Sequence, residues 1–193
     1  MKNILFFCLL LAGHSCFAQR FQIGAKAGVN FSNFTGDNIK SDGLVGFHVG
    51  GLLNFMVGNN FSIQPEVLFS TQGAKFDNGG MERDLKISYI NIPVMLKLKM
   101  NSGFYVELGP QVGFKLDEDA EIPNLPVENF AKNLDLSLGA GIGYHTRSGF
   151  GIGGRYIAGI SKVGDFDASA QIDPDFKNSV IQISVFYTLF NNR

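Results

Sequence analysis

The stretch Phe21-Gln22-Ile23-Gly24-Ala25-Lys26-Ala27-Gly28-Val29-Asn30-Phe31-Ser32 alternates between apolar residues at odd positions and polar residues or glycine at even positions. Only an extended strand has a side-chain period of two, because successive side chains point to opposite faces. The stretch therefore predicts a long β-strand with one apolar face and one polar, glycine-rich face. The class of protein depends on what the apolar face contacts.

The same alternation returns seven more times along the chain. The later segments are 45–55, 61–70, 85–98, 104–115, 134–144, 150–160 and 181–189. Tight turns at 57–60, 101–103 and 146–149 alternate with longer polar connections, which include 75–84, 117–132 and 161–174. An even number of strands, with short turns at one end and long loops at the other, is typical of bacterial outer-membrane barrels.

The fourth segment contains a change of phase. Its apolar residues occupy odd positions up to Tyr89 and even positions from Ile90 onward. Two explanations stay open: a β-bulge near Ser88 resets the phase, or the strand begins late and Tyr89 points inward.

Lipid fits the apolar faces better than the inside of a soluble, lipocalin-like barrel, which is the rival reading. An eight-stranded barrel has room inside for side chains or one small ligand, and the bulky Phe, Leu and Ile side chains exceed that space. Aromatic residues also recur beside the short turns, as in the girdle at a membrane interface. They are Phe55, Phe61, Phe104, Tyr144, Phe150, Tyr187 and Phe190.

A sheet in lipid must close on itself, because lipid cannot hydrogen-bond a free strand edge. We therefore expect the eighth strand to pair with the first. Pro65, Pro93 and Pro110 lie within predicted strands. Each lacks a ladder donor, so we expect local bulges beside them.

The first 18 residues resemble a secretory signal peptide. Lys2 precedes an apolar run that ends at Ala12, and Ala18 is a small residue before a polar one. We predict a signal peptide at 1–18 and one barrel domain at 19–193. Cleavage would remove both cysteines and make the formal net charge of −1 one unit more negative. That charge gives no basic footprint for nucleic acid.

Charged residues on the inward faces are expected to pair, because an unpaired buried charge costs several kcal/mol. Lys97 lies opposite Glu107 across the 101–103 turn, and Glu66 and Arg155 lie at similar distances from their own turns. We predict that these four residues form a structural charge network in the lumen. A path for ions or protons is the alternative.

No catalytic, cofactor or metal site is predicted. His48 and Asp135 fall on the inner face, but the pattern places no serine beside them, and His145 is expected to face the periplasm. Two acidic groups in the long connections are interpreted as solvated, although carboxylates also hold hard cations. These groups are the run 117–121 and Asp165, Asp167, Asp173 and Asp175.

Several segments together resemble the PorT-like family of outer-membrane β-barrels, also labelled porin-family proteins. The matching segments are 24–32, 64–70, 89–94, 104–111 and 138–144. The resemblance implies that prolines within the strands are tolerated. It also implies a link to protein secretion, although most relatives have no assigned role.

The sequence thus predicts an all-β, eight-stranded antiparallel transmembrane barrel of the up-and-down type, similar in size to OmpA and OmpX. It would be an outer-membrane monomer with periplasmic termini, in contact with lipids and lipopolysaccharide. We expect a structural or interaction role through long outer loops rather than an enzyme. The alternatives are an accessory part of a secretion system, a narrow conduit for small solutes, and a soluble lipocalin-like barrel.

Overall fold

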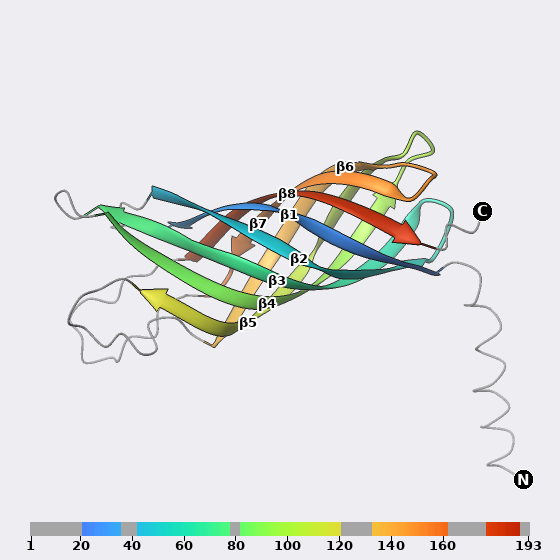
Figure 1. The fold of residues 1–193 in the computed structure, drawn as a ribbon. Helices are drawn as coiled ribbons and strands as arrows, with labels where there is room; N and C mark the ends of the chain where they lie inside the picture. The colour runs from blue at the N-terminus through green and yellow to red at the C-terminus, as the bar shows by residue number, and fades with distance from the viewer. Residues whose placement is uncertain (1–20, 36–41, 78–81, 121–132, 162–176, 190–193) are drawn as a thin grey trace, which may run out of the picture.

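The chain forms a closed barrel in which every strand pairs antiparallel with its neighbours and β8 pairs with β1 (Figure 1). The computed structural model describes residues 21–35, 42–77, 82–120, 133–161 and 177–189. The strands are β1 (Phe21–Thr35), β2 (Asp42–Met56), β3 (Phe61–Asp77), β4 (Glu82–Lys99), β5 (Phe104–Ala120), β6 (Leu134–His145), β7 (Phe150–Gly159) and β8 (Lys177–Leu189). The predicted signal peptide lies outside the described residues. Within them, no helix is long and apolar enough to cross a membrane.

Most of the large apolar side chains point outward. Phe47, Val67, Leu108 and Leu138 are between 44% and 54% exposed. The alternate positions carry polar residues and glycine and face the lumen, where most of them are buried. The predicted eight-stranded barrel is therefore confirmed. The lipocalin-like alternative is wrong, because it requires the bulky residues inside.

Aromatic residues gather at the end of the barrel that carries the short turns. The rings of Phe21 and Phe55 lie 5.3 Å apart, and those of Phe104 and Tyr144 lie 6.1 Å apart. The predicted residues at this level are exposed, apart from Phe190, which lies outside the described residues. This arrangement fits a girdle at a membrane interface.

The change of phase in β4 has a simple cause. Ile87 and Tyr89 are buried, and so are the odd positions from Asn91 to Lys97, so the strand keeps one phase across this region. The pairing shifts by one residue between Ser88 and Tyr89, and the extra residue is Leu116 on β5. The bulge considered near Ser88 is present, but its extra residue lies on β5, so it does not reset the phase of β4. Tyr89 points inward as the second explanation required, although the strand does not begin late. Apolar side chains simply continue into the lumen here.

The prolines do not produce the bulges that we expected. Pro65 pairs with Val94, Pro93 with Gln111 and Pro110 with Leu138. The register is the same on both sides of each proline. A missing N–H removes one ladder bond, and the neighbouring pairs are sufficient to keep the strands aligned.

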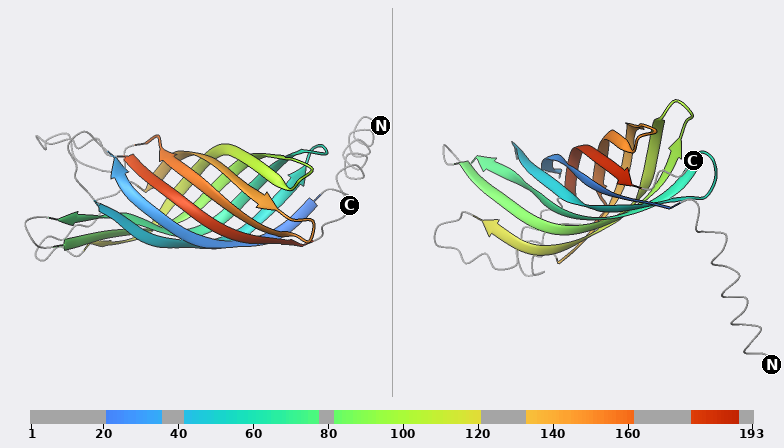
Figure 2. Two further views of the ribbon diagram at one scale, coloured as in Figure 1. Left: turned by 90° about the horizontal axis from the view of Figure 1, so that it is seen from above. Right: turned by 45° about the vertical axis from the view of Figure 1, so that its right-hand side comes forward.

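Strands β3, β4 and β5 extend furthest at the end away from the short turns (Figure 2). Parts of the connections predicted at 75–84 and 117–132 are strand, because β3 reaches Asp77 and β5 reaches Ala120. The ladder between β5 and β6 ends at Phe114 and Leu134. Beyond Phe114, β5 continues to pair with β4, so this end of β3–β5 extends past β6.

Candidate functional site

Five charged side chains meet inside the barrel and make its candidate site. Lys26 comes from β1, Glu66 from β3, Lys97 from β4, Glu107 from β5 and Arg155 from β7. Each lies at an inward position of its strand and is at most 7% exposed. The alternating pattern that turns the apolar residues outward is therefore also what concentrates these charges in the lumen.

Arg155 is at the centre of this charge network. Its Nη1 and Nη2 donate to the two carboxylate oxygens of Glu66 at 3.0 and 2.8 Å, and its Nε donates to Glu107 at 2.8 Å. Lys26 Nζ donates to the same Glu66 carboxylate at 3.2 and 3.3 Å. One guanidinium thus connects β7 to β3 and β5, with the two-pronged geometry that strengthens such pairs.

Lys97 closes the network toward the short turns. Its Nζ donates to Gln64 at 2.9 Å and lies 3.9 Å from the Glu107 carboxylate. It also lies 3.8 Å from the ring centre of Tyr105 and 4.8 Å from that of Phe186. Three cations face two carboxylates in this network, and the two aromatic rings stabilise the surplus positive charge.

The structure brings together all four residues predicted from the sequence and adds Lys26. The signal for Lys26 was present, since it occupies an even, inward position in the first strand. Its register gave no partner, because it faces Gly50 on β2 and Phe186 on β8. Only the curvature of the closed barrel brings it to Glu66, two strands away.

His48 has the serine neighbour that the sequence did not reveal. Its Nε2 lies 2.9 Å from Ser184 Oγ, and its Nδ1 lies 2.7 Å from Asn30 Oδ1. The sequence pattern alone placed no serine beside His48, whereas closure places β8 against β1 and so brings Ser184 within reach of β2. Asp135 is elsewhere and accepts hydrogen bonds from Ser137 and Ser161.

His145 also differs from the expectation. It is 1% exposed, its Nε2 lies 3.0 Å from Thr188 Oγ1, and its ring contacts that of Phe186. It faces the lumen rather than the periplasm, because it continues the inward phase of β6.

The acidic groups hold no cation site among the described residues. No cluster of three or more His, Cys, Asp or Glu side chains suitable for a metal occurs there. The segment 117–120 is the end of β5, whereas residue 121 and the four aspartates of the last long connection lie outside the described residues.

The profile of the outer membrane protein beta-barrel domain family matches residues 17–165. The chain belongs to this family. Membership and the outward apolar faces together make it an integral outer-membrane barrel. A comparison with curated proteins finds no match.

Solved outer-membrane barrels share the fold of this family member. The attachment invasion locus protein Ail of Yersinia pestis, in complex with the heparin analogue sucrose octasulfate, is 16% identical with a TM-score of 0.52. That alignment covers 88% of this chain and 99% of Ail. Neisserial surface protein A is 14% identical with a TM-score of 0.54, and the alignment covers 88% and 97%. At these identities the likeness concerns the fold alone.

Proposed function

We propose that this chain is a non-conducting outer-membrane anchor that presents its extended β3–β5 end to partners outside the cell. The observation that carries the proposal is the position of Arg155 across the lumen, hydrogen-bonded to Glu66 on one side and Glu107 on the other. Buried side chains fill the barrel above and below this level. A filled lumen favours an interaction role over the conduction of solutes.

Conductance tests the filled lumen. We expect the purified barrel to give no discrete openings in a planar lipid bilayer. A variant with Arg155→Ala and Glu66→Ala together removes the central bridge and serves as the positive comparison. Regular single-channel openings of the unmodified barrel would contradict the proposal and favour the small-solute conduit.

Orientation is the second part of the proposal. We infer that the termini and short turns lie in the periplasm, which places the longer strand ends outside, as is usual for such barrels. Single cysteines at Ser148, in a short turn, and at Lys177, at the opposite end, are both at exposed positions. On intact cells, a maleimide that cannot cross the outer membrane should label Lys177→Cys and leave Ser148→Cys unlabelled. The reverse result would overturn the orientation.

We propose that the outward surface of the barrel contacts lipid and lipopolysaccharide. The outward apolar belt, bounded by the aromatic girdle, supports lipid contact. This belt does not identify a specific partner outside the cell. Deletion of β3–β5 residues beyond the membrane, followed by binding assays on whole cells, would locate a partner on the extension.

A role as an accessory part of a secretion system is the second proposal, and only the PorT-like sequence segments support it. Deletion of the gene should then reduce the export of surface cargo. Normal export would remove this proposal without affecting the first.

We also propose that the chain is not an enzyme. Ser184, His48 and Asn30 resemble a nucleophile, a base and an orienting residue, but each is at most 4% exposed. Asn30 is held by further hydrogen bonds to Ser70, Thr71 and Phe47. This burial supports a structural role, since a catalytic serine needs access to its substrate.

A further inference from the structure

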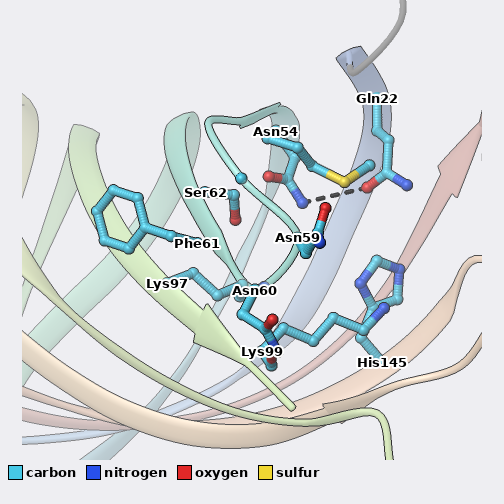
Figure 3. Close-up of a pocket in the computed structure, with 11 residues that line it drawn as sticks. Gln22, Asn54, Asn59, Asn60, Phe61, Ser62, Lys97, Lys99 and His145 are labelled. Atoms are coloured by element: carbon cyan, nitrogen blue, oxygen red, sulfur yellow. Dashed lines mark hydrogen bonds between the residues drawn. The ribbon is translucent and has the colours of Figure 1, made fainter. Parts of the chain in front are cut away.

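The mouth of the barrel at the short-turn end contains a small pocket lined by polar side chains together with Met56 and Phe61 (Figure 3). The pocket has a volume of about 40 Å³ and lies between the β2–β3 turn and the ends of β4 and β6. A buried site needs about 10–15 Å³ to hold one water molecule. The pocket therefore has room for a compact ion but not for a sugar or a peptide.

The charged side chains that line the pocket are all positive. Lys97 and Lys99 line it, and its lining contains no aspartate or glutamate. Lys97 is already engaged with Gln64 and Glu107. Lys99 is half-buried, and no described carboxylate lies within ion-pair distance of it. Arg147 is close enough to repel it electrostatically. The pocket therefore favours an anion.

Two buried acceptors in the lining have no hydrogen-bond partner within the described part of the chain. They are Asn54 Oδ1 and His145 Nδ1, on residues that are 4% and 1% exposed. The Asn54 amide nitrogen is used, since it donates to Gln22 at 3.1 Å. Figure 3 shows Asn54, Lys99 and His145 around the same space. Leaving such acceptors unmet is unfavourable, so a ligand that donates hydrogen bonds fits this site.

The hydrogen-bond network assigns the tautomer of His145. Thr188 Oγ1 donates to the Gly149 carbonyl oxygen at 3.3 Å, so it accepts from His145 Nε2–H at 3.0 Å. A neutral imidazole with its proton on Nε2 has a lone pair on Nδ1. With the proton on Nε2, Nδ1 is an acceptor that no described donor meets.

We propose that this pocket binds a phosphoryl group that carries a hydroxyl, with free hydrogen phosphate as its simplest form. The anionic oxygens accept from Lys99, and the P–O–H group donates to Asn54 Oδ1 or His145 Nδ1. Sulfate has nearly the same size and shape but has no proton to donate at neutral pH. The two unmet acceptors thus distinguish phosphate from sulfate, whereas the lysines alone do not.

Binding to the full barrel purified from membranes in detergent tests the proposal. Titration calorimetry should show saturable binding of inorganic phosphate that is about tenfold tighter than that of sulfate, as one net hydrogen bond provides. Glycerol 3-phosphate is the third probe. At about pH 8 its phosphoryl group is a dianion without a P–O–H, so it should bind no tighter than sulfate, and tighter binding than free phosphate would contradict recognition of the P–O–H. No saturable phosphate binding, or equal affinity for phosphate and sulfate, would overturn the proposal.

Three variants separate the contributions. Lys99→Gln should weaken the binding of both anions about tenfold. Lys177→Gln, the same change at the opposite end of the barrel, should leave the binding of both unchanged. His145→Gln keeps a donor for Thr188 but has no acceptor at the Nδ1 position, so the preference for phosphate over sulfate should become smaller while sulfate binding is unchanged. If His145→Gln does not fold, Asn54→Leu removes the other acceptor. If the acceptor variant that folds binds phosphate and sulfate more weakly by the same factor, the acceptors do not bind the phosphate hydroxyl.

Discussion

Arg155 on β7 donates two hydrogen bonds to Glu66 on β3, which lies on the far side of the lumen. Neither residue is adjacent to the other in any strand ladder. The guanidinium is therefore a cross-brace for the cylinder rather than a link between neighbouring strands. Removing one partner of such a buried pair leaves an uncompensated charge in a site with little water.

We expect Glu66→Gln to destabilise the folded barrel by about 3–5 kcal/mol, because it leaves Arg155 and Lys26 without their shared carboxylate. Reversible urea unfolding in lipid vesicles would measure this change. Lys177→Gln, which also removes one charge but at an exposed position, should alter stability by less than about 0.5 kcal/mol. Glu66→Met combined with Arg155→Met should cost less than the sum of the single changes. Additive losses would mean that the pair is not coupled.

The outward face can be tested at two depths. Val49 lies in the middle of β2, whereas Val106 is two residues from the girdle residue Phe104. We expect Val49→Arg to cost about 2–4 kcal/mol and Val106→Arg only about 0–1 kcal/mol, since a charge near the interface stays close to water. Folding in lipid vesicles provides the measurement. Equal tolerance at both depths would be incompatible with a lipid-facing surface.

Glycine at 151 makes room for a lumen ring. A Cβ at this position would overlap the Phe186 ring, which packs against His145. We expect Gly151→Ala to cost about 1–3 kcal/mol, as overpacked sites do. Gly58→Ala is the control, because no atom lies within 4 Å of its Cβ position. Phe186→Leu should relieve part of the loss, and a failure to do so would show that the overlap is not its cause.

Ser184 should behave as a structural residue. We expect no labelling of the folded barrel by a fluorophosphonate probe, because Ser184 is only 4% exposed. Ser184→Ala removes the partner of His48 Nε2 and should cost about 1–3 kcal/mol. Labelling that disappears in Ser184→Ala would instead indicate a reactive serine and contradict the non-enzymatic proposal.

The alternation of residues was sufficient to predict the barrel and which face of each strand points outward. A period of two specifies the strand and both of its faces, and short turns specify which strands are neighbours. For this reason the pairing of Lys97 with Glu107 follows directly from the 101–103 hairpin. Local geometry alone places those two residues opposite one another.

Tertiary structure decided every contact that crosses the lumen. Lys26 reaches Glu66, and Ser184 reaches His48, only because the sheet curves and closes between β1 and β8. Strand periodicity reports which face a side chain occupies but not the distance across a cylinder. That distance depends on the tilt and stagger of all eight strands together, which no single segment of the sequence encodes.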